Sequence, residues 1–160
     1  MFKTSPFGWV SQYYFSFFFA YGAYLPFWAL WLKSEGISSS DIGIILGLAF
    51  ATRCISNIVI TPRVHRVEQY IPTLRWLSLL SVLFFAAHGV LNGDFVWIAL
   101  ATIVLNLCFG PIMPISDALA NYYTNLKMLD YGRSRLWGSV AFIVGSLVVG
   151  WIVSHWGESW

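Results

Sequence analysis

The sequence predicts an all-α, polytopic membrane protein with about five transmembrane helices. Of its 160 residues, 58% are hydrophobic and only 10% are charged, whereas an average soluble domain has about 25% charged residues. The mean hydropathy is +0.69. The charges are clustered and leave long uncharged runs between them, and uncharged runs of about 18 or more residues are typical of helices that cross a membrane. A membrane β-barrel would instead need alternating segments of about 10 residues, and the sequence has no such pattern.

Four uncharged runs, together with a fifth apolar stretch that carries Arg53 near its middle, give the expected positions of the helices. They form one amino-terminal transmembrane bundle over residues 1–160, with helices near residues 9–32, 42–61, 76–93, 95–118 and 135–155. At about 1.5 Å per residue, each helix is long enough to cross roughly 30 Å of hydrocarbon. Pro26, Pro111 and Pro114 are expected to kink the first and fourth helices.

The basic residues predict the orientation of these helices. Arg53 would lie within the membrane and Lys33 on one side, with the other basic residues on the opposite side: Lys3, Arg63, Arg66, Arg75, Lys127, Arg133 and Arg135. Cytoplasmic loops of membrane proteins carry an excess of lysine and arginine. We therefore expect a multi-pass protein of the bacterial inner membrane with a cytoplasmic amino terminus.

Two charged residues, Asp117 and Arg135, are expected to lie close together in the membrane. The polar segment 123–130 is typical of a short link between two helices, and the two residues are equally distant from its centre. They would therefore lie at matching depth on neighbouring helices. An unpaired charge at the bilayer centre costs about 2.5–3.5 kcal/mol even on the most lenient scale, which favours a pair that faces the bundle interior. Such a pair either clamps the two helices or takes part in substrate recognition.

Arg135, Ser139 and Phe142 share one helical face, at positions i, i+4 and i+7. An arginine, a hydroxyl and an aromatic ring along one stripe suit a small ligand that has a carboxylate or hydroxyl groups and a flat apolar part. For Ser139 and Phe142, the alternative is that both are packing residues. Arg53 is either a cation for an anionic substrate or the partner of an acidic residue in helices outside this chain.

No motif of an enzyme or cofactor site is present, such as a nucleophile elbow, a zinc-protease motif or a phosphate-binding loop. Cys54 and Cys108 fall inside predicted helices, where cysteine behaves as a small apolar residue rather than as a disulfide or metal ligand. His88 is more typical of a hydrogen-bonded core histidine than of a proton carrier. We expect no enzymatic activity, no cofactor, no metal site and no nucleic-acid partner.

Three stretches resemble a known family of transporters. Residues 22–32 and 37–45 are similar to the first two helices of the lactose permease branch of the major facilitator superfamily. Residues 116–121, together with 130–139, are closer to the phenylpropionate permeases of the same superfamily. The resemblance covers nearly the whole chain. It departs from the family pattern in the loop after the second helix, where His65 stands in place of the usual aspartate.

This resemblance implies a fold of two six-helix halves with the substrate held between them near the membrane midplane. The sixth helix and the second half would lie outside the 160 residues. It also implies that the acid and the arginine that contact substrate in this family correspond to Asp117 and Arg135. The stacking aromatic residue would be Phe142, with Ser139 one turn earlier.

The implied function is that of a secondary active transporter, a proton symporter that imports a small aromatic carboxylate such as 3-phenylpropionate by alternating access. Its partners would be the substrate, protons, the lipid bilayer and the carboxyl-terminal half of the transporter. Asp117 would repel an anionic substrate unless it is paired or protonated. Binding of such a substrate would therefore require Arg135 as the partner of Asp117. The alternatives are a sugar or nucleoside proton symporter of the same superfamily and a truncated, non-transporting membrane fragment.

Overall fold

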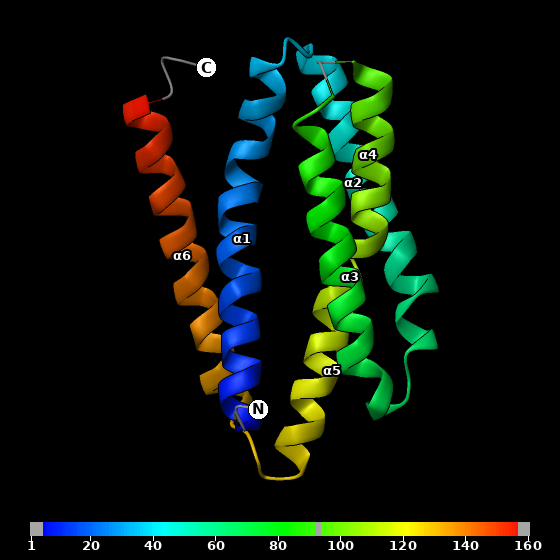
Figure 1. The fold of residues 1–160 in the computed structure, drawn as a ribbon, viewed down its shortest axis with the longest axis vertical. Helices are drawn as coiled ribbons and strands as arrows, with labels where there is room; N and C mark the ends of the chain where they lie inside the picture. Colours follow the sequence, from blue (N-terminus) through cyan, green and yellow to red (C-terminus); the bar gives the residue numbers. More distant parts are fainter. Residues whose placement is uncertain (1–4, 92–93, 157–160) are drawn as a thin grey trace. The chain divides into compact units, whose positions relative to one another are not determined.

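A computed structural model describes residues 5–91 and 94–156 of the chain, and its regular structure in these ranges is helical. The elements in chain order are α1 (Pro6–Ser34), α2 (Ser39–Val59), the 3₁₀ helix η1 (Thr61–Arg63), α3 (Val67–His88), α4 (Phe95–Phe109), α5 (Ile112–Asn125) and α6 (Tyr131–Trp156) (Figure 1).

Five segments are long and apolar enough to cross a membrane, which confirms the predicted number. They are Pro6–Ser34, Ser39–Arg63, Val67–His88, Phe95–Asn125 and Tyr131–His155. The chain is therefore a multi-pass membrane protein. Many of its large apolar side chains are exposed, for example Phe50, Ile58 and Trp76, as expected for helices whose outer faces contact lipid.

The third span lies closer to the amino terminus than the uncharged run indicated. The run suggested residues 76–93, whereas α3 covers Val67–His88. The side chain of Gln69 accepts a hydrogen bond from the backbone N–H of Arg66 (3.3 Å), so the helix begins within the polar segment. Glu68 and exposed Arg75 lie in the first half of the helix. Charges near a helix end can reach the membrane surface, so a search for uncharged residues alone misplaced this span.

The fourth span is interrupted between α4 and α5, at Gly110 and Pro111. Proline has no backbone N–H and its ring clashes with the carbonyl four residues earlier, so it ends or kinks a helix. The interruption agrees with the kink predicted for this span. By contrast, α1 is a single helix that includes Pro26.

The helix starts follow from local sequence. Ser38 caps α2, because its side chain accepts a hydrogen bond from the backbone N–H of Asp41 (3.2 Å). Asp94 caps α4 through the N–H of Val96 (2.9 Å). Gly36 has a φ of +81° in the turn before α2, a conformation that favours glycine.

The chain falls into two compact units. Residues 1–34 and 120–160 form one, here called the α1–α6 unit, and residues 35–119 form the other, here called the α2–α4 unit. In the α2–α4 unit, helices α2 and α3 both pack against α4, around the fully buried side chains of Ile45, Leu74 and Ile98.

In the α1–α6 unit, α1 and α6 lie side by side because glycines let their backbones approach closely (Figure 1). A Cβ atom on Gly22 would collide with the backbone carbonyl of Phe142, and one on Gly145 would collide with the backbone carbonyl of Phe19. The hydroxyl of Ser146 also donates a hydrogen bond to the backbone carbonyl of Gly22 (2.9 Å). Small residues at such crossings are typical of membrane helix pairs.

Candidate functional site

Arg135 lies one turn into α6, against aromatic rings of α1. Its guanidinium carbon is 4.7 Å from the centroid of the Phe18 ring and 5.3 Å from that of Tyr14. The Tyr14 side chain is completely buried, and Arg135 is half-buried. A guanidinium within about 6 Å of a ring centroid is attracted by the negative face of the ring. The cation is thus held on an aromatic surface within the α1–α6 unit.

Close contacts on either side of Arg135 fix the register of α1 and α6. The hydroxyl groups of Ser11 and Ser134 form a buried hydrogen bond of 3.2 Å. One turn further along α6, a Cβ atom on Gly138 would collide with the Phe18 ring. The absence of a side chain at Gly138 therefore leaves room for the ring that supports Arg135.

The other two predicted residues of this stripe have different surroundings. Ser139 is exposed, whereas Phe142 is half-buried and its ring centroid lies 6.1 Å from that of Tyr21. The backbone of Phe142 also lies at the close approach of Gly22. Phe142 therefore takes part in α1–α6 packing, as the alternative interpretation of this residue predicted. Its role toward a ligand stays a prediction.

Asp117 lies on α5 and is half-buried. It belongs to the α2–α4 unit, whereas Arg135 belongs to the α1–α6 unit. Their pairing therefore stays a prediction from the sequence. Next to Asp117, the buried hydroxyl of Ser116 donates a hydrogen bond to the carbonyl of Ile112 (2.6 Å) and so stays within its own helix.

Arg53, on α2, contacts α4 through a specific set of side chains. Its Nη2 donates a hydrogen bond of 3.0 Å to Oδ1 of Asn106, and its guanidinium carbon lies 5.2 Å from the centroid of the Phe109 ring. Hydrogen bonds to a charged group contribute about 1.5–3 kcal/mol. The arginine is thus anchored to the neighbouring helix.

A buried polar network extends from this contact. Nδ2 of Asn106 donates to the carbonyl of Thr102 (2.8 Å), and the hydroxyl of Ser56 lies 3.4 Å from the carbonyl of Asn106. Asn106 and Thr102 are almost completely inaccessible to solvent. Sequence reasoning did not select Asn106 as a site residue. The available signal was a carboxamide within an otherwise apolar run, next to a span that contains an arginine.

His88 is a buried, hydrogen-bonded histidine, as its sequence context indicated. Its Nδ1 lies 2.8 Å from the carbonyl of Phe84, and its Nε2 lies 3.3 Å from the hydroxyl of Thr102. Both ring nitrogens therefore have partners within the α2–α4 unit. His88 joins α3 to the same stretch of α4 that holds Arg53.

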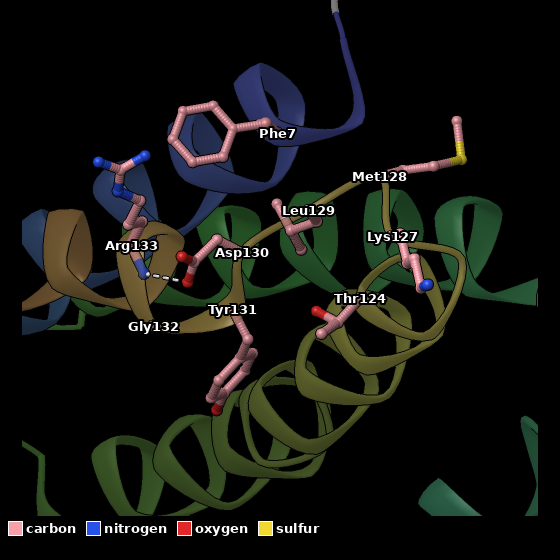
Figure 2. Close-up of a pocket in the computed structure, with 9 residues that line it drawn as sticks. All are labelled: Phe7, Thr124, Lys127, Met128, Leu129, Asp130, Tyr131, Gly132 and Arg133. Atoms are coloured by element: carbon pink, nitrogen blue, oxygen red, sulfur yellow. Dashed lines mark hydrogen bonds between the residues drawn. The ribbon is translucent and has the colours of Figure 1, made fainter.

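A pocket of about 760 Å³ lies in the α1–α6 unit, where the loop between α5 and α6 meets the start of α1 (Figure 2). It is lined by Phe7, Thr124, Lys127, Met128, Leu129, Asp130, Tyr131, Gly132 and Arg133. The Asp130 carboxylate accepts a hydrogen bond from the backbone N–H of Arg133 (3.1 Å), and the side chains of Lys127 and Arg133 point in different directions. None of the residues predicted to bind substrate lines this pocket, so it is not the predicted site.

Comparison with known proteins identifies the family. Residues 7–160 match the MFS_1 like family. The chain belongs to this family of the major facilitator superfamily. The fold described above is accordingly part of a major facilitator domain, and the resemblance noted in the sequence is confirmed.

Two curated members of the superfamily illustrate the relationship. This family member is 42% identical over 146 residues to the "Probable 3-phenylpropionic acid transporter" of Escherichia coli (strain K12), covering 91% of this chain and 38% of that protein. It is 31% identical over 147 residues to the "Maltose permease" of Geobacillus stearothermophilus, covering 89% of this chain and 36% of that protein. The chain thus spans less than two-fifths of the length of these relatives. No solved structure matches it.

Proposed function

We propose that the chain is part of a secondary active transporter that imports a small aromatic carboxylate, such as 3-phenylpropionate, together with protons by alternating access. The observation that carries the proposal is the position of Arg135 on the rings of Tyr14 and Phe18. An arginine held on an aromatic surface offers its planar donors to a carboxylate. The identity of 42% to a protein named as a 3-phenylpropionic acid transporter supports the same substrate class.

Within this proposal, the substrate contacts come from five residues: Arg135, Ser139, Phe142, Asp117 and Arg53. Arg135 and Arg53 would bind the carboxylate, and Phe142 would stack on the substrate ring. Asp117 would keep Arg135 oriented, because a lone carboxylate repels an anionic substrate. The membrane would be the bacterial inner membrane, with the amino terminus in the cytoplasm, as the distribution of basic residues suggests.

The test is uptake of labelled 3-phenylpropionate by cells that express the complete product of the gene, with and without Arg135→Ala. We expect uptake well above that of empty-vector cells, and its loss with Arg135→Ala. Arg133→Ala is the matched control, since Arg133 is an exposed arginine two residues away on the same helix and should leave uptake unchanged. Cells in which the protein reaches the membrane but no aromatic acid is taken up would refute the substrate assignment.

A second candidate is a sugar symporter, favoured by the 31% identity to a protein named as a maltose permease. Labelled maltose in the same cells separates the two proposals. The third possibility, a non-transporting fragment, predicts that the protein reaches the membrane in these cells without moving either substrate.

A further inference from the structure

Asn106 is the one carboxamide among the residues of α4, and it is 1% exposed. Buried polar side chains are costly unless their hydrogen bonds are satisfied. Asn106 makes two such bonds. Its side-chain oxygen accepts from Arg53 on α2, and its side-chain nitrogen donates to the carbonyl of Thr102 on its own helix.

The chemistry of these partners fixes the orientation of the amide. A guanidinium can only donate, so it requires the oxygen of Asn106, and a backbone carbonyl can only accept, so it requires the nitrogen. A flipped amide would lose both bonds. The Asn106 side chain therefore holds one rotamer, and the Nη2 atom of Arg53 is held 3.0 Å from its oxygen.

The same face of α4 also restricts the rest of the Arg53 side chain. Phe109 and Gly110 follow Asn106 at i+3 and i+4, and the Phe109 ring lies beside the guanidinium. A Cβ atom on Gly110 would lie 3.1 Å from Cγ of Arg53 and would collide with the hydroxyl of Ser56. Gly110 therefore provides the space through which the arginine passes.

We propose that Asn106 is a positioning residue that holds the Arg53 guanidinium in the direction in which it binds the carboxylate of the transported substrate. This inference rests on the proposed function. An arginine side chain has about 2 kcal/mol of rotamer entropy, and fixing it before the ligand arrives raises affinity. An amide can do this without cancelling charge, whereas a carboxylate at the same position would form an ion pair with Arg53 and compete with the substrate.

The proposal concerns substrate affinity rather than folding, so its test measures KM and maximal rate separately. In cells expressing the complete gene product, Asn106→Leu keeps the approximate volume but removes both hydrogen bonds. We expect KM for labelled 3-phenylpropionate to rise about tenfold, the effect of losing a hydrogen bond to a charged group, with the maximal rate per transporter in the membrane changed by less than about twofold. Inhibition by the neutral analogue 3-phenylpropionamide should change little, because it has no carboxylate for Arg53 to bind.

A double-mutant cycle shows whether Asn106 acts through Arg53. In the Arg53→Gln background, Asn106→Leu should leave KM unchanged. Asn57→Leu is the matched control. Asn57 lies one turn from Arg53 on α2, and its Oδ1 is buried without a hydrogen bond, so its replacement should not alter KM for the carboxylate.

If Asn106→Leu does not reach the membrane, Asn106→Asp replaces it, since it keeps the shape and the acceptor oxygen. The added charge should then raise KM for the carboxylate while inhibition by the neutral amide stays the same. Equal effects of the Asn106 change with and without Arg53, or an unchanged KM, would overturn the inference even though uptake and its dependence on Arg135 persist. Failure of the unmodified protein to take up any aromatic acid would instead refute the proposed function, and this inference with it.

Discussion

The guanidinium of Arg135 lies over the ring of Phe18, with 4.7 Å between the guanidinium carbon and the ring centroid. The contact joins two helices that are far apart in the sequence, and Gly138 makes it possible because any side chain there would displace the ring. The residues that bring α1 and α6 together therefore also determine where the cation lies.

Replacing Phe18 by leucine should weaken substrate binding. The change keeps an apolar side chain but removes the aromatic face, and such cation–π contacts contribute about 0.5–2 kcal/mol. We expect KM for 3-phenylpropionate to rise by roughly 2- to 30-fold, as this energy implies. Phe15→Leu is the control, because Phe15 lies on the same helix and is 38% exposed. An effect of Phe15→Leu as large as that of Phe18→Leu would show that general packing, not the contact with Arg135, sets affinity.

Alanine substitutions at two glycines should differ in their effects on stability. Gly22→Ala should destabilise the protein, by about 1–3 kcal/mol for overpacking, because the new Cβ collides with the Phe142 carbonyl. A Cβ on Gly43 would meet no atom within 4 Å, so Gly43→Ala should be neutral or stabilising by up to about 1 kcal/mol through helix propensity. Thermal unfolding of the purified protein in detergent measures both. Equal melting temperatures for the two variants would argue against close packing of α1 on α6.

These glycines also show what could be predicted from sequence. Length and hydropathy were enough to predict the number of membrane spans, because the hydrocarbon thickness sets helix length irrespective of the partners of each helix, although the third span was placed too far along the chain. Gly43 and Gly47 lie four residues apart on α2, a spacing typical of close helix packing, yet a Cβ atom on either would meet no atom within 4 Å, whereas one on Gly145 would collide with the Phe19 carbonyl. Which glycine is used depends on the tertiary partner, which a spacing pattern does not specify.

Asn106 illustrates the same point for the candidate site. Arg53 was conspicuous because a charge in an apolar run has few explanations, whereas a single asparagine has many. Asn106 stands out only once α2 is packed on α4, because that packing brings its side chain within hydrogen-bond distance of Arg53. The helical period placed Arg135 and Phe142 on one face, but the rings of Tyr14 and Phe18 could be assigned to Arg135 only once α1 and α6 were paired.

The predicted Asp117–Arg135 pair leads to a test by stability. Removing one partner of a buried ion pair costs about 3–5 kcal/mol because it leaves a lone charge, whereas replacing both with apolar residues is often neutral. We therefore expect Asp117→Leu and Arg135→Leu each to lower the melting temperature, and the double variant to recover most of the loss. Additive losses in the double variant would mean that the two residues do not interact. Asp41→Leu with Arg135→Leu is a suitable control for additivity, since Asp41 lies in the capping turn of α2.

His88 should contribute to stability but not to proton coupling. The Phe84 carbonyl can only accept a hydrogen bond, so Nδ1 of His88 donates to it, while Nε2 lies within hydrogen-bond distance of the Thr102 hydroxyl. Both ring nitrogens are thus engaged in a buried structural network. His88→Gln should therefore reduce the free energy of unfolding by about 1–3 kcal/mol through unsatisfied partners, while the pH dependence of uptake stays that of the unmodified protein. The measurement is initial uptake of 3-phenylpropionate, normalised to the amount of transporter in the membrane. The pH is varied between 5 and 8, about the range in which a free histidine titrates. A pH profile that flattens in His88→Gln, with uptake otherwise retained, would instead assign the proton to this histidine and make the Thr102 hydroxyl part of its path.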